Sequence, residues 1–303
     1  MSIPLPAVSL AAVPGRRLAT LELAREIERH GFSGIYCPSF GDGVALCEAL
    51  AFSTERIVFG TGIQPIYTRP AADFAQAASF IHEVSGGRFR FGIGVSHAPA
   101  LARLGLSGGK PVEDTRRFVE GMRSAQRVGE LPPIVLATLR KRMIALAGEV
   151  AEGLMFANGA RSHMKDSLSV LPEAKRSDPS FFVGNMIPTC ISDDREAAKL
   201  VNRRTLTGYV MLPNYRNYWK EAGYVEEMEA IEKALQAGER DRIPGLLSDR
   251  WLADTTIFGS AAQVREEVEG WYAAGIRTPI LVPSSAVGNQ MKAFEELFAA
   301  FAD

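Results

Sequence analysis

The sequence predicts an α/β fold, a (β/α)8 (TIM) barrel with one helical insertion. Short apolar runs rich in β-branched and aromatic residues alternate along the chain with longer segments of helical periodicity. Eight such runs can be distinguished, and eight parallel strands are the number that closes this kind of barrel. A length of 303 residues fits the barrel together with the insertion.

The first two strand–helix pairs set the alternation that the rest of the chain repeats. Residues 7–10 form the first strand, and residues 16–30 form a helix that Gly31 stops. Residues 34–37 form the second strand, and a helix follows near residues 44–52.

The third and fourth strands occupy residues 57–61 and 89–95. Pro70 suits the first position of a helix running to Val84, because the N–H that proline lacks is not needed there. A helix near residues 112–128 follows the fourth strand.

The second half of the chain repeats the pattern with longer connections. Strands are predicted at residues 133–137, 153–156 and 181–190, with helices at 141–150 and 164–171. A long helical region over residues 194–252, interrupted by Pro213 and Pro244, then separates the seventh strand from the eighth. This region is the expected insertion, serving as a lid or as part of a dimer face. The remaining elements are a helix over 260–274 that begins with a capping box, a strand over 279–282 and a helix over 290–301.

An open, doubly wound parallel sheet is the structural alternative, and periodicity alone does not separate it from a barrel. The chain shows no repeat, no low-complexity tract and no Gly-, Pro- or Ser-rich linker. We therefore expect a single domain over residues 1–303.

Composition limits the class of protein. A net charge of −1 gives no reason to expect nucleic acid or a membrane surface as a partner. No apolar stretch reaches the ~18–20 residues of a membrane span, and the N-terminus lacks a secretory signal. Three cysteines without a CxxC pair fit reduced thiols, so a cytoplasmic enzyme is expected.

Functional residues are expected at the carboxyl ends of the strands, where (β/α)8 barrels place their active sites. Residues 91–97 begin like a dinucleotide fingerprint but lack its third glycine, and residues 108–110 lack the other residues of a P-loop. The glycines at the end of the fourth strand either let a flat ligand approach the backbone or serve tight packing.

Two polar features stand out at these strand ends. His97 is the histidine just past a strand, where it either contacts a cofactor and moves a proton or bonds a loop carbonyl. Residues 138–142 (Thr-Leu-Arg-Lys-Arg) open the helix after strand five, where backbone N–H groups and basic side chains favour an anion such as phosphate. The alternative is a solvated, charged helix start. No His, Cys, Asp or Glu cluster has metal-ligand spacing, so no metal is expected.

These motifs together resemble the bacterial luciferase-like family, and within it the methylenetetrahydromethanopterin-reductase-like oxidoreductases that use coenzyme F420. Residues 54–70 resemble the family's third strand and its following loop, and residues 84–97 resemble its fourth, which is the most specific segment. Residues 147–153 and 257–260 add weaker support. The resemblance implies a non-prolyl cis peptide at Gly62–Ile63, in a bulge behind the central ring of the cofactor.

The resemblance also implies which residues bind a deazaflavin, or FMN as the alternative cofactor. They are Ser39, Thr61, Gly62, Ile63, Gly94, Val95, Ser96, His97, Ala137, Thr138, Leu139, Arg140 and Lys141. His97 is the catalytic candidate. Phe40, Tyr67 and Ser284 are candidates for the substrate pocket, although the same side chains would also serve to cover the barrel.

Two positions depart from the family's dehydrogenases. Val95 stands where those have a catalytic glutamate, and Ser39-Phe40 stands where they have an Asp-His pair. We therefore expect a reductase that delivers hydride from the reduced deazaflavin to an unidentified small organic substrate. The alternatives are an FMN monooxygenase of a two-component system and a flavin-binding barrel without catalysis. The resemblance further implies a homodimer.

Overall fold

The computed structural model describes residues 4–39 and 42–302, which form two compact units. The first unit comprises the chain up to residue 157 together with residues 168–184, and the second comprises residues 158–167 and the chain from 185 onward. The single domain expected over residues 1–303 stays a prediction.

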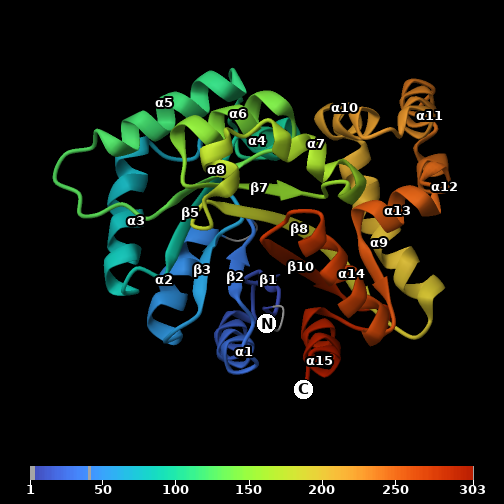
Figure 1. The fold of residues 1–303 in the computed structure, drawn as a ribbon, viewed down its shortest axis with the longest axis horizontal. Helices are drawn as coiled ribbons and strands as arrows, with labels where there is room; N and C mark the ends of the chain where they lie inside the picture. The colour runs from blue at the N-terminus through green and yellow to red at the C-terminus, as the bar shows by residue number, and fades with distance from the viewer. Residues whose placement is uncertain (1–3, 40–41, 303) are drawn as a thin grey trace. The chain divides into compact units, whose positions relative to one another are not determined.

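The first unit contains strands and helices in alternation (Figure 1). In chain order they are β1 (Ala7–Ser9), α1 (Arg17–Arg29), β2 (Gly34–Cys37), α2 (Gly43–Ser53), β3 (Val58–Thr61), β4 (Gln64–Pro65), α3 (Ala71–Val84), β5 (Phe89–Gly94), α4 (Ala98–Arg103), α5 (Pro111–Arg123), β6 (Ile134–Ala137), α6 (Lys141–Val150), β7 (Gly153–Ala157) and α8 (Glu173–Ser177).

The strands of the first unit are parallel and pair in chain order from β1 to β7, with β4 pairing the end of β5. They are buried almost throughout, which is why they read as continuous apolar runs rather than alternating ones. Between the strands and helices, the Phe89 ring packs against Phe59 and Phe91, and the Phe91 ring also packs against Phe74. The ring centroids of these pairs are 5.6–6.0 Å apart.

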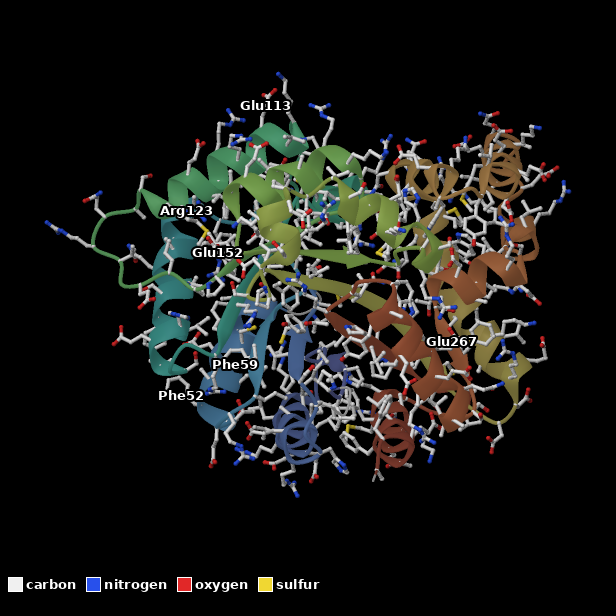
Figure 2. The ribbon with its side chains drawn as sticks, in the orientation of Figure 1. Phe52, Phe59, Glu113, Arg123, Glu152 and Glu267 are labelled. Carbon is white, nitrogen blue, oxygen red and sulfur yellow. The ribbon has the colours of Figure 1, made fainter. Side chains whose placement is uncertain are left out.

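Glu152 connects three elements near the amino-terminal end of β7. Its carboxylate lies 2.8 Å from the Arg123 guanidinium at the end of α5 (Figure 2) and accepts a hydrogen bond of 2.9 Å from the backbone N–H of Ile134 in β6. The loop before β7 is thereby bonded to α5 and to β6.

The second unit carries most of the helical insertion. In chain order its elements are the 3-10 turn η1 (Arg161–His163), the start of α7 (Met164–Ser169), most of β8 (Phe182–Ile191), α9 (Arg195–Val210), α10 (Pro213–Glu221), α11 (Val225–Gln236), η2 (Arg240–Arg242), α12 (Ile243–Leu246), α13 (Asp249–Thr255), β9 (Ile257–Gly259), α14 (Ala261–Ala273), β10 (Thr278–Ser284) and α15 (Gln290–Ala300).

All eight predicted strands are present, and the predicted insertion corresponds to α9–α13. The capping box before α14 is confirmed, because the Ser260 and Gln263 side chains each bond the other residue's backbone N–H. The elements that the sequence did not predict are short: α4, α8, β4 and β9 have six residues or fewer and show no measurable period.

Among the boundaries that differ from the prediction are the end of α5 and the start of α3. Helix α5 ends at Arg123, several residues before the predicted end at 128, and Pro70 is the N-cap of α3 rather than its first residue. Pro70 has the extended ψ of 147°, which a helical residue cannot have, so the helix begins one residue later.

Candidate functional site

The candidate site is built on the carboxyl ends of β2, β3, β5 and β6. These strands are parallel neighbours, so their carboxyl ends lie at one edge of the sheet. The register places Cys37 beside Thr61 and Ile93 beside Leu136. The last residues of these strands and the residues that follow them include all of the predicted site positions except Ser284.

A one-residue bulge interrupts the third strand at the predicted place. Gly60 is opposite Arg90 and Gln64 is opposite Ile93, so the three residues 61–63 face only two residues of β5. The peptide between Gly62 and Ile63 is cis, which confirms the prediction. The bulge re-aims the chain toward the end of β5.

Hydrogen bonds on both sides hold the bulge. The buried Thr61 hydroxyl donates to the Gly92 carbonyl at 2.6 Å, and the Gly62 N–H donates to the Cys37 carbonyl at 2.7 Å. Just beyond the bulge, the Ile66 N–H donates to the Gly94 carbonyl at 3.0 Å. The segment is therefore fixed between β2 and β5.

The glycines of β5 are required by packing inside the protein. A Cβ on Gly92 would lie 1.9 Å from the Thr61 carbonyl oxygen. A Cβ on Gly94 would lie 2.7 Å from the Ala137 Cβ and 3.2 Å from Ile63 Cδ1. Of the two interpretations made from the sequence, tight packing accounts for these glycines. The same contacts bring Ile63, Gly94 and Ala137 together, and the partly exposed Ile63 and Ala137 give this edge an apolar surface.

Thr138 follows β6 and is the least satisfied polar residue of the site. Its N–H donates to the Met155 carbonyl at 2.8 Å, and the residue is 5% exposed. Its hydroxyl is buried and has no hydrogen-bond partner within the described residues. A buried hydroxyl without a partner carries an uncompensated loss of hydration, so its position favours a ligand that bonds it.

The start of α6 adds an anion-binding element next to Thr138. Arg140 is the N-cap and its side chain makes no capping hydrogen bond, while Leu139 is half-buried and Lys141 and Arg142 are exposed in the first turn. Helix N-termini attract anions through their N–H groups and dipole. Basic side chains at this end of a helix oppose the dipole unless an anion binds there.

The end of β5 carries the predicted catalytic residue. Val95 and Ser96 are half-buried, and Ser96 has a left-handed φ of 60°. His97 is the N-cap of α4, and its backbone carbonyl accepts from the N–H groups of Ala100 and Leu101. Burial lowers the pKa of His97 below its usual 6.5, because the protein hydrates the imidazolium less well than water does. His97 is therefore neutral at pH 7.

The remaining predicted residues have different settings. Ser39 is exposed after β2, and Phe40 lies outside the described residues. Tyr67 is partly buried and hydrogen-bonded to Asp114. Ser284 is the last residue of β10 in the second unit and is partly buried.

Sequence reasoning missed Asp42 and Asp114. Asp42 caps α2 by accepting from the Ala45 N–H, has a left-handed φ of 66° and lies 3.6 Å from the Arg69 guanidinium. An aspartate three residues before Ala45 at a helix start is the cap signal that would have found it. Asp114 contacts Tyr67 across 47 residues and has no local signal.

Within residues 4–39 and 42–302, no group of His, Cys, Asp or Glu side chains is arranged to hold a metal ion. The helices of the same residues are all too short or too polar to cross a membrane.

Comparison with known proteins agrees with these features. The model of the luciferase-like monooxygenase family matches residues 9–278. A Mycobacterium tuberculosis protein provisionally named coenzyme F420-dependent oxidoreductase Rv3520c is 25% identical over 281 aligned positions, which cover 77% of this chain and 81% of that protein. The 5,10-methylenetetrahydromethanopterin reductase of Archaeoglobus fulgidus is 24% identical over 275 positions, covering 80% of this chain and 81% of its own.

Among solved structures, the coenzyme F420-dependent tetrahydromethanopterin reductase of Methanopyrus kandleri is similar with a TM-score of 0.76. It is 18% identical, and the likeness covers 97% of each chain. At this identity the likeness shows the fold alone, and that fold is the (β/α)8 barrel predicted from the sequence.

Proposed function

The chain belongs to the luciferase-like monooxygenase family, and from this premise we propose that it is an oxidoreductase that uses coenzyme F420. Its substrate is a small organic electrophile, and it works in the direction of reduction. The similarity to an F420-dependent oxidoreductase and to a methylenetetrahydromethanopterin reductase supports the cofactor and the direction. One structural observation carries the proposal: the bulge, the apolar edge and the unpartnered Thr138 hydroxyl follow neighbouring strands of one sheet.

The residues present fit a flat ring with a phosphate-bearing tail. Ile63, Gly94 and Ala137 form an apolar surface for one face of the ring, with the bulge behind it. The Thr138 hydroxyl, the first N–H groups of α6 and the Arg140 and Lys141 side chains would bind the phosphate. Packing of side chains alone does not explain the unpartnered hydroxyl of Thr138.

The same residues favour reduction over alcohol oxidation. When bound, the reduced deazaflavin supplies a hydride to an electrophilic centre. The chain then needs to orient the two partners, exclude water and provide a proton, and it has no carboxylate at Val95 or Ser39 to remove a proton from an alcohol. His97, neutral at pH 7, has a ring N–H suited to donating a hydrogen bond or a proton to the substrate.

The cofactor assignment is tested by titrating the purified protein with F420 and with FMN while following the fluorescence of each. We expect saturable F420 binding and a much weaker response to FMN. Tight FMN binding without an F420 response would contradict the proposal and favour an FMN monooxygenase. F420 binding without reoxidation of the reduced cofactor by any of a panel of electrophiles would favour the non-catalytic barrel.

Steady-state kinetics and cofactor binding together distinguish a role of His97 in proton transfer from a role in binding. His97→Ala should lower turnover more than cofactor affinity if the imidazole moves a proton. Equal losses in turnover and affinity would assign it to binding only.

We also propose that the protein acts in the cytoplasm as a homodimer. The dimer is supported by the family resemblance. Light scattering of the purified protein should give twice the chain mass of 32.9 kDa. The mass of a single chain at micromolar concentration would contradict it.

A further inference from the structure

Tyr67 joins three segments of the first unit. Its hydroxyl donates to Asp114 Oδ2 at 2.8 Å and accepts from the Gly109 N–H at 3.2 Å. Tyr67 lies in the loop after β4, Gly109 lies in the loop between α4 and α5, and Asp114 lies in the first turns of α5. One hydroxyl therefore connects elements that are more than 40 residues apart in the sequence.

Gly109 is suited to this contact. A Cβ on Gly109 would lie 2.3 Å from Asp114 Oδ2, so a larger residue there would displace the carboxylate. A Cβ on Gly108 would make only ordinary contacts, 3.7 Å from Tyr67 Cε2 and 3.4 Å from Leu101 Cδ1, which places this residue beside the tyrosine ring and α4. Of the two glycines, which the sequence offered only as an incomplete P-loop, Gly109 is therefore the one that the contact requires.

The charges around the hydroxyl favour the same arrangement. The hydrogen bond from Tyr67 and the ion pair with Arg117 lower the pKa of Asp114, so its carboxylate is ionised near neutral pH. Partial burial raises the pKa of Tyr67, so its hydroxyl keeps the proton that it donates.

The loop after β4 holds both ends of the segment that follows β5. Ile66 bonds Gly94, immediately before this segment, and the adjacent Tyr67 bonds Gly109 near its end. Between the two contacts lie Val95, Ser96, His97 and the whole of α4. Two consecutive residues thus fix the segment 95–110 beside the bulge at residues 61–63.

We propose that Tyr67 is a positioning residue whose hydroxyl fixes the segment 95–110, and with it His97, over the face of the cofactor site. The inference rests on the proposed function for the identity of the cofactor. Tyr67 thereby has a role different from the substrate contact expected from the sequence: it acts through the segment it holds.

The first test uses the ligand-free protein and amide hydrogen exchange. Tyr67→Phe keeps the ring and removes both bonds, so peptides covering residues 98–110 should exchange about ten-fold faster. Tyr224→Phe is the matched control, because it removes a tyrosine–aspartate bond of 2.9 Å to Asp254 in the second unit. It should leave residues 98–110 unchanged. Unchanged exchange in Tyr67→Phe would overturn the inference.

Two variants of the partner separate the hydrogen bond from general destabilisation. Asp114→Asn keeps an oxygen that accepts from Tyr67 and should exchange like the wild type at residues 98–110. Asp114→Ala removes only the bond to the carboxylate and should exchange faster than the wild type but no faster than Tyr67→Phe, and the double variant should be no faster than Tyr67→Phe. Additive effects in the double variant would mean that the two side chains act separately, against the inference.

The second test measures the access of solvent to F420 bound in the protein. Tyr67→Phe should bind F420 within about two-fold of the wild type but allow several-fold stronger quenching of its fluorescence by iodide. Equal quenching in both proteins would overturn the covering role of the segment. Failure of the wild type to bind F420 would instead refute the proposed function, while the exchange test would still decide the role of Tyr67.

Discussion

Thr61 and Thr138 are both buried threonines at strand ends, and their hydroxyls have opposite settings. The Thr61 hydroxyl donates to the Gly92 carbonyl at 2.6 Å, whereas the Thr138 hydroxyl has no partner within the described part of the chain. A satisfied buried hydroxyl contributes to stability, and an unsatisfied one reduces it unless a ligand bonds it. At the scale of single residues, this difference separates a structural threonine from a binding one.

Thr138→Val should therefore affect binding without harming the fold. Valine has nearly the same shape and removes a hydroxyl that bonds nothing in the protein, so the free energy of unfolding should stay within about 0.5 kcal/mol of the wild type or rise. F420 affinity should fall by about 1–3 kcal/mol, the range for a hydrogen bond to a charged group. Urea denaturation and fluorescence titration measure the two effects.

Thr61→Val is the matched control for that experiment. It removes the bond to Gly92 and should lower the free energy of unfolding by about 1–3 kcal/mol, because the buried carbonyl loses its donor. A Thr138→Val protein that binds F420 as well as the wild type would show that the hydroxyl takes no part in the site.

His97 predicts a pH dependence of stability. Its pKa in the folded protein is lowered from 6.5 by burial, so the unfolded chain binds the proton more readily. The contribution of the neutral His97 to the free energy of unfolding is complete above pH ~6.5 and is lost as the pH falls below that value. The free energy of unfolding then changes by at most about 1.4 kcal/mol per pH unit. His97→Gln should thus lose less stability than the wild type between pH 7 and 5, as denaturation at several pH values would measure. Parallel curves for the two proteins would contradict the prediction.

Local sequence identified the residues whose role is local. The start of α6 lies within a few residues of a strand end, where the barrel rule directs attention, whereas the bulge and the cis peptide at Gly62–Ile63 were expected from the family resemblance of residues 54–70. Tyr67 and Gly109 were each noticed, but neither their contact nor Asp114 was predicted, because the pairing depends on how two loops meet. The sequence has no periodic signal for such a contact.

At the scale of elements, Arg88 connects the start of β5 to the end of α2. Its guanidinium donates to the carbonyls of Ala51, Thr54 and Ile57 and to the Thr54 hydroxyl, at 2.8–3.2 Å. It also lies 5.2 Å above the Phe59 ring. These carbonyls belong to the last turn of α2 and to the turn before β3.

Arg88→Ala should lower the free energy of unfolding by about 2–4 kcal/mol. The reason is that several partly buried carbonyls lose their donor at once, and each loss costs part of a buried hydrogen bond. Arg29→Ala is the control, because Arg29 forms an exposed ion pair with Glu26 and such pairs contribute about 0–1 kcal/mol. Equal effects of the two variants in urea denaturation would contradict the structural role of Arg88.

The insertion shows what the sequence left open at this scale. Its helical nature was predicted, but its attachment depends on long-range contacts: Trp219 Nε1 donates to the Asn158 carbonyl at 3.2 Å, and Tyr218 Oη accepts from the Ala160 N–H at 3.0 Å. Asp254 accepts from both the N–H and the hydroxyl of Ser162 at 2.7–2.8 Å. Within the second unit, two helices of the insertion, α10 and α13, are thus bonded to the residues that follow β7, so a lid motion would have to break these bonds.

At the scale of the whole molecule, the positions of the main strands and helices were predictable because buried parallel strands and amphipathic helices have distinct periods. The barrel was favoured by the count of eight strands. The division of the insertion into α9–α13 was predictable only at Pro213, which begins α10, and at Pro244, which lies in the first turn of α12. The substrate was not predictable, since three residues expected near it, Phe40, Tyr67 and Ser284, share no chemistry that selects one electrophile.

Ligand-linked stability is the prediction that belongs to the molecule as a whole. A ligand that binds only the folded protein raises the free energy of unfolding by about 2.7 kcal/mol at a concentration of 100 times its Kd. For a chain of 303 residues, that increase corresponds to a rise of about 4 °C in Tm. We expect F420 to produce this shift and FMN at the same concentration to produce none. Thr138→Val should show a smaller shift at the same F420 concentration, because its Kd is higher. A shift with FMN alone would reverse the choice of cofactor, and an equal F420 shift in Thr138→Val would place the phosphate elsewhere.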